Sequence, residues 1–399
     1  MESDWKSQLD KAVDALFPRM VEVRRHLHRH PEISGKEQKT SLYLYQLLGD
    51  DGFDIRIGPD GRGVVADLRT NRAAPLIGLR ADIDALHIHE ATGVEYRSQV
   101  PGVMHACGHD AHTATVYGAL NAIAALRNSS QPPCDLNVRA IFQPAEESCQ
   151  GAAEMIAFGA LEEVAAILAT HMDPSRALGK VGLRAGVFTA NCDCMSIVIT
   201  GRGVHAARPH EAHDPIAAAA QIINALYLYI PRVTDSQEAV VVTIGQIQGG
   251  DTANVIPEQV QLKGTIRTLD HKVRDTTMEH IRRIARSVGE TCGTRIEVAF
   301  GLGCRSVRND VELINLLRNT TTEILGAGAA EEIARPSMGS EDFAFYLDTV
   351  PGAMVRLGCT SAKAGGAMLH SPHFDIDEEV MRVGAKILAR ALVYWSLPS

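Results

Sequence analysis

Aromatic residues are scarce in this 399-residue chain, since Phe, Trp and Tyr together make up only 5% of it. A protein that stacks nucleic-acid bases on aromatic side chains needs more of them. Basic residues are also in deficit, because 39 Lys and Arg face 48 Asp and Glu, which gives a net charge of −9. Proteins that bind nucleic acid by neutralising phosphates carry a basic excess. The composition therefore argues against a nucleic-acid partner.

Long apolar runs are absent as well. No run approaches the roughly 20 residues that a helix needs to cross a bilayer, and the opening Met1 to Trp5 is too polar for a signal peptide. With 45% apolar and 22% charged residues, the composition is that of an ordinary globular protein. We therefore expect a cytoplasmic protein that has no membrane partner.

Apolar runs rich in Val, Ile and Leu alternate with helix-like segments in residues 1–190. Strands are expected over 63–68, 76–81, 136–142 and 165–170, and helices over 111–126 and 151–158. This alternation predicts an α/β domain built around a mostly parallel sheet. Ligands of such sheets bind at the carboxyl ends of the strands, so we look for chemistry there.

The segment 191–301 has a different order of expected strands and helices. It predicts strand, helix, strand, strand, helix and strand, over 194–200, 214–229, 240–246, 259–268, 272–288 and 295–300. This order is the ferredoxin-like βαββαβ pattern. We therefore expect a ferredoxin-like domain of roughly 110 residues, inserted into a discontinuous catalytic domain formed by 1–190 and 302–399.

Polar residues follow three of the expected strands, where a buried core would not place them. They are Asp82 and Asp84, then Glu146 and Glu147, and finally His171. Cys107 and His109 precede the helix expected from residue 111. Thiolate, imidazole and carboxylate groups at one sheet edge suit zinc or a related divalent ion. A nucleophilic Cys107 is the alternative, but a thiol beside several imidazoles and acids is more simply explained as a metal ligand.

The adjacent pair Glu146 and Glu147 is the most informative detail. Neighbouring side chains of an extended segment point in different directions, so one can face a metal ion and the other its bound water. A divalent ion lowers the pKa of its water from about 15.7 toward 7, and a nearby carboxylate can then accept the proton. Two exposed acids at a strand end are the alternative.

Four motifs make the chain resemble the metal-dependent N-acyl-amino-acid amidohydrolases. This branch of the aminoacylase and carboxypeptidase family of zinc peptidases includes hippurate hydrolases and auxin-conjugate hydrolases. The motifs are RADIDAL at 80–86, MHACGHD at 104–110, QPAEE at 143–147 and MGSEDF at 338–343. The resemblance runs from His28 to Pro372 and so covers nearly the whole chain.

The resemblance implies a site that typically holds two metal ions per subunit. The implied ligands are Cys107, His109, Glu147, His171 and His370. It also implies that Glu146 is the general base and that Asp82 orients a ligand or the metal pair. The wider peptidase family has a metal-binding histidine two residues before this acid, whereas this chain has Arg80, as the amidohydrolase branch leads us to expect. Zn, Mn, Co and Ni all stay open as the native metal.

The inserted domain matches the lid and dimerisation domain of the family. His205 resembles a histidine that reaches an active site, often the site of the partner subunit, and which of the two it reaches is left open. Asn254 and Arg267 resemble contacts to the substrate carboxylate, for which an Arg fork and an amide donor are suited. A loop amide and a solvated charge are the alternatives for these two residues. We expect a homodimer or a higher homo-oligomer.

These interpretations predict a hydrolase that cleaves the amide bond of small-molecule N-acyl amino acids. The attacking group would be a metal-activated water, with Glu146 as general base. A dipeptidase or carboxypeptidase using the same site is one alternative, and a catalytically silent metal-binding protein is another. His87 and His89 stand where the family more often has Pro and Gln, which leaves the shape of the substrate pocket open.

Overall fold

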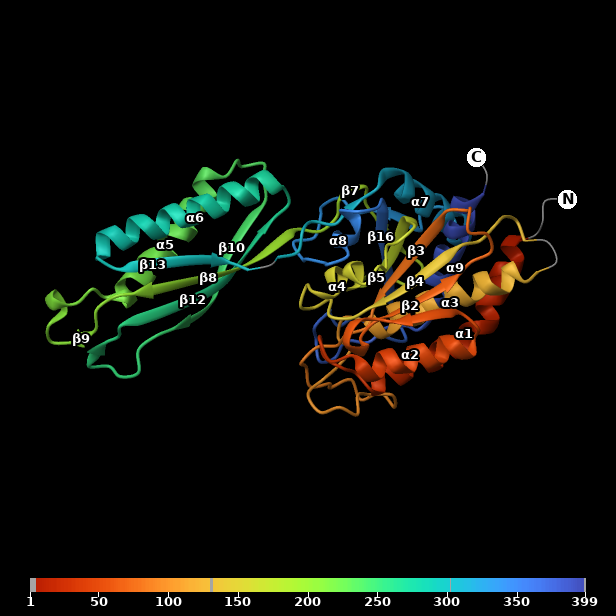
Figure 1. The fold of residues 1–399 in the computed structure, drawn as a ribbon, viewed down its shortest axis with the longest axis horizontal. Coiled ribbons are helices and arrows are strands. Elements are labelled where there is room, and N and C mark those ends of the chain that lie inside the picture. Colours follow the sequence, from red (N-terminus) through yellow and green to blue (C-terminus); the bar gives the residue numbers. More distant parts are fainter. Residues whose placement is uncertain (1–4, 130–131, 302, 398–399) are drawn as a thin grey trace. The chain divides into compact units, whose positions relative to one another are not determined.

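The computed structural model describes residues 5–129, 132–301 and 303–397, and the described chain divides into two compact units. Unit 1 comprises Met1–Gly186, Arg308–Arg335 and Asp342–Ser399, and unit 2 comprises Val187–Val307 and Pro336–Glu341 (Figure 1). The short segment Pro336–Glu341, placed in the catalytic domain by the sequence prediction, groups with unit 2. Residue 302, where that prediction resumed the catalytic domain, lies outside the described residues.

An eight-stranded sheet forms the centre of unit 1. In spatial order its strands are β1 (Asp54–Ile57), β2 (Val64–Leu68), β4 (Val138–Gln143), β3 (Leu76–Asp82), β5 (Val164–Ala177), β16 (Gly352–Thr360), β6 (Val181–Leu183) and β15 (Ala330–Glu332). β3 pairs in parallel with β4 and β5, and β5 pairs in parallel with β16. The expected α/β fold with a mostly parallel sheet is confirmed.

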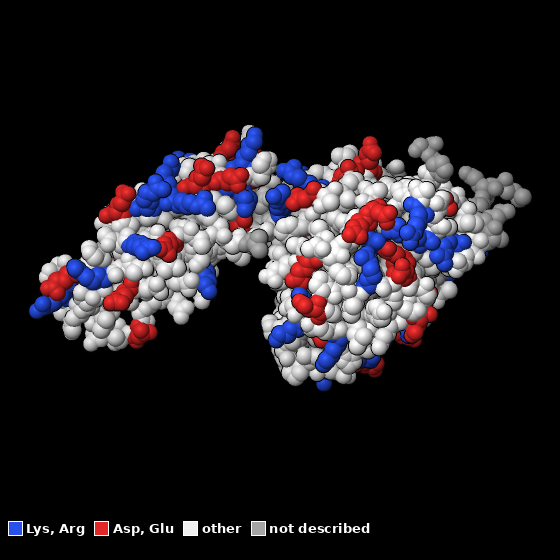
Figure 2. Space-filling model, viewed as in Figure 1, with Lys and Arg blue, Asp and Glu red and all other residues white. Residues whose placement is uncertain are grey.

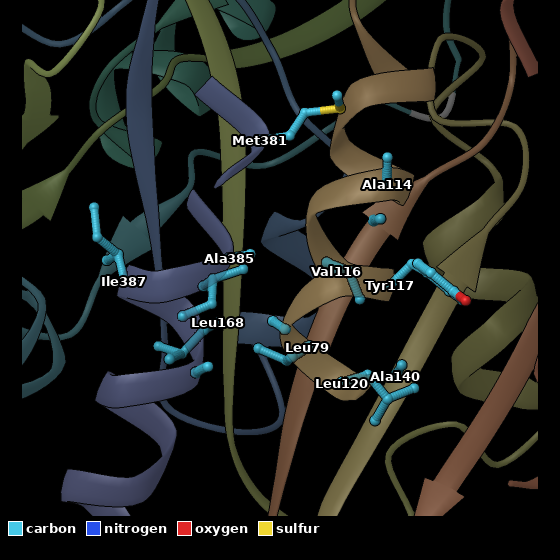
Figure 3. Packing of buried hydrophobic residues seen from close by; sticks show 14 of the residues in the cluster. Leu79, Ala114, Val116, Tyr117, Leu120, Ala140, Leu168, Met381, Ala385 and Ile387 are labelled. Carbon is cyan, nitrogen blue, oxygen red and sulfur yellow. The ribbon is translucent and has the colours of Figure 1, made fainter. Parts of the chain in front are cut away.

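Helices α1 (Trp5–Arg29), α3 (His109–Arg127) and α9 (Glu379–Ser396) share one hydrophobic core with this sheet. Figure 3 shows Val116 and Leu120 of α3 close to the strand residues Leu79 and Ala140. Helix α3 is buried along nearly its whole length, which explains why its sequence is rich in small and apolar residues. The N-terminus of α3 is thereby fixed near the ends of β3 and β4.

Several elements differ from the sequence expectation. Helices α1 and α2 (Gln38–Asp50) were not anticipated, and α1 is continuous despite Pro18 in its interior. Strand β5 continues to Ala177, so His171 lies within the strand and not at its end as expected. The remaining helices of unit 1 are α4 (Gly151–Ala157), α7 (Val311–Leu325) and α8 (Ala344–Leu347) and the 3-10 turn Pro59–Gly61.

Unit 2 contains a four-stranded antiparallel sheet with the order β10-β12-β8-β13. Its elements along the chain are β8 (Asn191–Thr200), α5 (Pro215–Val233), β10 (Val240–Gln248), β12 (Gln259–Thr268), α6 (His271–Cys292) and β13 (Arg295–Phe300). This is the ferredoxin-like topology. The carboxylates of Asp214 and Asp270 accept hydrogen bonds from the first turns of α5 and α6, so each helix begins where its N-cap residue stands.

Short strands complete the list of elements. They are β7 (Gly186–Val187), β9 (Val204–His205), β11 (Val255–Ile256) and β14 (Arg308–Asn309), with a 3-10 turn at Pro209–Glu211. β9 and β11 pair as an antiparallel ribbon in unit 2.

Acidic and basic side chains are interspersed on the face of each unit that Figure 2 shows. Among the described helices, α5 alone is long and apolar enough to cross a membrane, judged by length and composition only. Ala218, Ile222 and Leu226 on one face of α5 are buried in the core of unit 2. That core packing accounts for part of its apolar character.

Candidate metal centre and active site

A glycine fixes the loop that presents the first two candidate ligands. Gly108, between Cys107 and His109, has a φ of 85°, a conformation that side chains other than glycine rarely adopt. A Cβ at this position would lie 3.0 Å from Cγ of Met172 on β5. The chain can therefore turn tightly against β5 before α3 begins at His109.

The five residues expected as metal ligands meet in unit 1. Sγ of Cys107, a ring nitrogen of His109 and a carboxylate oxygen of Glu147 lie within 4.8 Å of one another. Nε2 of His171 is 3.7 Å from Sγ of Cys107. Nε2 of His370 is 3.2 Å from Oε1 of Glu147. Segments far apart in the sequence thus bring one thiol, three imidazoles and one carboxylate to a single place.

Backbone carbonyl groups set the orientation of two of these histidines. Nδ1 of His109 donates to the carbonyl oxygen of Asp84 at 2.9 Å, and Nδ1 of His171 donates to that of Met172 at 2.8 Å. Each ring therefore leaves Nε2 to face the cluster, and this is the nitrogen through which each histidine could bind a metal ion. Nε2 of His109 is buried and has no hydrogen-bond partner among the described residues.

This unpaired nitrogen shows that the residues fit a divalent cation. A buried polar atom without a partner is costly unless something absent from the chain satisfies it. The thiol of Cys107 and the carboxylate of Glu147 raise the pKa of His370 to about 10. The cluster thus attracts positive charge, and its sulfur, nitrogen and oxygen donors suit zinc or a similar ion.

Asp82 lies beside the cluster and is held by two partners. Its Oδ1 accepts from Nδ1 of His112 at 2.6 Å, its Oδ2 accepts from Arg80 at 2.7 Å, and Oδ2 is 3.7 Å from Nε2 of His109. Burial opposes ionisation of Asp82, but His109, His112 and Arg80 hold its pKa well below the usual range. Nε2 of His112 accepts from the backbone N–H of Met172. Both ring nitrogens of His112 are therefore engaged, and this residue supports Asp82.

The two adjacent glutamates lie in a turn that follows β4, and not in the extended segment expected from the sequence. Ala145 has a φ of 52°, and its N–H donates to Oε1 of Glu37 at 2.8 Å. Glu37 is fully buried and also accepts from the N–H of Gly35. This carboxylate thus holds an uncommon backbone conformation directly before Glu146 and Glu147. Glu146 is itself buried, with 7% of its surface exposed.

Arg80 links this region to the motif at 338–343. Its guanidinium donates to Oε1 of Gln143 and to Oδ1 of Asp342, both at 2.9 Å. Asp342 also accepts from Gln143 and from the N–H of Ala152. Carboxylate oxygens of Asp342 and Glu146 lie within 4.8 Å of each other. In place of a ligand histidine, the chain thus has a buried arginine that ties together the carboxylates around the centre.

Sequence reasoning placed Asp84 at the sheet edge without a specific role and did not mention Glu37. Asp84 accepts from Ser34 at 2.6 Å and from the N–H of Glu147 at 3.0 Å, so it connects Glu147 to the His109 side of the cluster. Asp84 stands inside a recognised motif, which is a usable signal. Glu37 gave no signal, because its partner Ala145 is 108 positions away.

The candidate residues of unit 2 do not all meet. His205 on β9 and Asn254 beside β11 are neighbours in one exposed ribbon, where the N–H of Ala206 donates to the carbonyl oxygen of Asn254. Arg267 lies near the other end of β12 and donates to the carbonyl oxygen of Met338. The strand rises by about 27 Å over the eight residues between its ribbon end and Arg267. Within one copy of unit 2, Arg267 is therefore far from His205 and Asn254.

His87 and His89, whose effect on the pocket the sequence left open, are both exposed in the loop after β3. No hydrogen bond or ion pair of their side chains is recorded in the described part of the chain.

Comparison with known proteins adds a family to this geometry. The family model described as Peptidase family M20/M25/M40 matches residues 78–394. The chain belongs to this peptidase family. An N-acetylcysteine deacetylase of Bacillus subtilis is 37% identical over 380 residues, which are 95% of this chain and 97% of that protein. A thermostable carboxypeptidase of Saccharolobus solfataricus is 35% identical over 398 residues, or 98% of each chain.

A solved structure agrees with this assignment. A Bacillus subtilis protein described as a dinuclear metal binding peptidase of the M20 family is similar to this chain, with a TM-score of 0.81 and 34% identity. The match covers 96% of this chain and 99% of that one. The resemblance predicted from the four motifs is confirmed, and this M20 family member is a metal-dependent amidohydrolase.

Proposed function

We propose that this protein hydrolyses N-acyl amino acids to a carboxylic acid and a free amino acid. The observation that carries the proposal is the buried, unpaired Nε2 of His109, which faces the thiol of Cys107 and the carboxylate of Glu147. The similarity to an N-acetylcysteine deacetylase supports an acylated amino acid as substrate.

Five residues would hold the metal, with Asp82 beside them: Cys107, His109, Glu147, His171 and His370. A bound divalent ion would polarise the amide carbonyl and lower the pKa of a coordinated water. Five donors exceed the four that a tetrahedral ion takes, which supports two ions per subunit. We keep Zn, Mn, Co and Ni as candidates, because the donor set does not separate them.

Glu146 would act as the general base in this proposal. It takes the proton of the attacking water and gives it to the departing amine, while Glu147 next to it serves the metal. The contacts support this division, because the carboxylate of Glu147 lies within 4.8 Å of Cys107 and His109, whereas that of Glu146 lies within 4.8 Å of Asp342.

A dipeptidase or carboxypeptidase activity is the second candidate, favoured by the similarity to the thermostable carboxypeptidase. An assay on the N-acetyl, N-benzoyl and aminoacyl derivatives of one amino acid distinguishes the two candidate activities. Hydrolysis is measured as the release of free amine. We expect the acyl derivatives to be cleaved with the higher kcat/KM. Faster cleavage of the dipeptide would contradict the proposal and support the peptidase.

We further propose a homodimer formed through unit 2. Its edge strand β10 has a free side in the described sheet, and α5 exposes large apolar side chains. Leu228 is 73% exposed and Ile247 is 59% exposed, with Tyr227 and Val241 nearby in sequence and also exposed. Unpaired strand edges and apolar surface of this kind are typical of interfaces. A symmetric pair is the simplest arrangement.

In this dimer His205 and Asn254 would serve the partner subunit's site, while Arg267 would serve its own. The separation of these residues within one unit 2 supports this, because a small substrate cannot touch both ends of β12 in one copy. His205 would then stabilise negative charge on the attacked carbonyl oxygen, and Asn254 and Arg267 would bind the substrate carboxylate.

A mixing experiment tests this arrangement. His205→Ala and Glu146→Gln are each expected to be inactive. Unfolding and refolding them together at equal amounts makes half of the dimers mixed, each with one intact site, so about a quarter of wild-type activity should return. No return of activity, despite mixed dimers detected by mass spectrometry, would place His205 in the site of its own subunit.

Finally, we propose a cytoplasmic location. A thiolate ligand at Cys107 needs a reduced cysteine, which a reducing compartment maintains. Cell fractionation with an antibody against the chain tests this.

A further inference from the structure

We propose that a pocket in unit 1, apart from the candidate metal ligands, binds a small amphipathic carboxylate. Such a ligand joins an aromatic or branched apolar body to a single carboxylate group. The pocket lies between the end of α1, the start of α2 and the loop at residues 100–103, and its volume is about 540 Å³. Small-molecule sites commonly measure ~300 to 1,000 Å³. None of the five candidate metal ligands lines it, so the inference does not depend on the proposed function.

Apolar groups form the body of the pocket. Leu27, Pro31 and Val103 are buried residues that line it. The rings of His26 and Tyr43, which also line it, stack with centroids 3.9 Å apart and an angle of 17° between their planes. Two stacked rings present a flat, rigid surface, which suits a planar or branched apolar group.

The charged side chains along the same pocket are two lysines and one glutamate, so their sum is positive. Lys36 and Lys39 line it, and neither has an ion-pair partner recorded in the described part of the chain. Glu32 is the acid among the lining residues, and its Oε2 already accepts the backbone N–H of Thr40 at 2.8 Å. Two lysines without a recorded ion-pair partner and one acid that already accepts a backbone N–H leave a net attraction for an anion.

Apolar walls and a cationic rim together define the class of ligand. A phosphate or sulfate would leave the apolar walls unused, whereas a neutral apolar molecule would leave the two lysines unused. A monocarboxylate with an apolar body satisfies both, because lysine binds carboxylates as a point charge while the body displaces water from Leu27 and Val103.

Titration calorimetry of the metal-loaded protein with 4-phenylbutyrate tests the proposal. Replacing both lysines, Lys36→Gln with Lys39→Gln, should weaken binding about tenfold, the loss expected for a charged contact. Lys11→Gln, a change of an exposed lysine elsewhere on α1, should leave the affinity unchanged. The alcohol 4-phenylbutan-1-ol should bind the wild type and the double variant equally.

Two further variants separate this pocket from the metal cluster, which could also bind a carboxylate. Val103→Trp should abolish binding of 4-phenylbutyrate by filling the pocket, and His370→Ala should leave it intact. The double lysine variant keeps the test valid if Val103→Trp fails to fold, because Lys36 and Lys39 are exposed. Unchanged affinity in the double variant, an equal loss in Lys11→Gln, a loss confined to His370→Ala, or no binding to the wild type would each overturn the proposal.

Discussion

The two sheets of this protein bury their side chains in different ways. All six residues of β4 in unit 1 are buried, whereas every residue of β10 in unit 2 is partly buried or exposed. Unit 1 covers its sheet and holds its polar groups in buried pairs such as Arg80 with Asp82. Unit 2 covers one face and leaves His205 and Asn254 in solvent. The comparison teaches that the proposed metal ligands are preorganised within one unit, whereas His205 and Asn254 need a second body to become buried.

The largest effect should come from a substitution in unit 1, where the proposed site is buried. Glu146→Gln removes the proposed base without changing the size of the side chain, so kcat should fall by about 1,000-fold. The metal content should stay at the wild-type level, because Glu146 is not among the proposed ligands. Steady-state kinetics together with elemental analysis of the purified variant checks both. A wild-type rate in the metal-loaded variant would remove Glu146 from the mechanism.

The strands and candidate site residues of unit 1 were also easier to predict from the sequence than those of unit 2. The strands β3 and β4 were expected because continuous apolar runs are typical of strands covered on both faces. Cys107 and His109 were predicted as ligands because they stand in the motif at 104–110, directly before the helix expected from residue 111. Helix α1 was missed, since Pro18 interrupts the helical signal. Glu37 could not be found, because its effect depends on a backbone contact with distant Ala145.

A substitution on the exposed surface of unit 2 should give the next largest loss of activity. Leu228→Glu places a charge in the apolar surface of α5 and should convert the proposed dimer to a monomer. Activity should then fall by about 100-fold or more, because each site loses the proposed contacts from both His205 and Asn254 of the partner subunit. Metal content should be unchanged, because the metal ligands all lie in unit 1.

Light scattering after size-exclusion chromatography, run beside the activity assay, checks this prediction. Thr291→Glu on the exposed end of α6 is a matched control, and it should change neither the molecular mass nor the activity. A monomer that keeps full activity would reject the shared site.

A smaller effect is expected where the support of the active site is changed. Glu37→Leu removes the acceptor that holds Ala145, so kcat should fall about tenfold while KM stays within about twofold. Glu37→Gln keeps an acceptor oxygen for the same N–H and should recover most of the rate. Steady-state kinetics of both variants decides the matter. Equal losses in the two would mean that the charge of Glu37, and not its hydrogen bond to Ala145, is what matters.

The smallest effect concerns stability. Chelation should lower the melting temperature of unit 1 by about 5 °C, because an ion that binds only the folded state stabilises it. Unit 2 holds no proposed ligand, and its melting should not change. Differential scanning calorimetry with and without chelator resolves the two transitions. An equal shift of both transitions would show that the metal does not act on unit 1 alone.

The central claim is that the cluster around His109 holds the metal that hydrolyses N-acyl amino acids. The most direct test measures the metal content of the purified protein and its release of free amine from N-acetyl and N-benzoyl amino acids, before chelation, after chelation and after adding Zn or Mn back. We predict bound divalent metal in the wild type, release that stops with the chelator and returns with the ion, and little metal in His109→Ala. Release that continues in the metal-free protein would contradict the account.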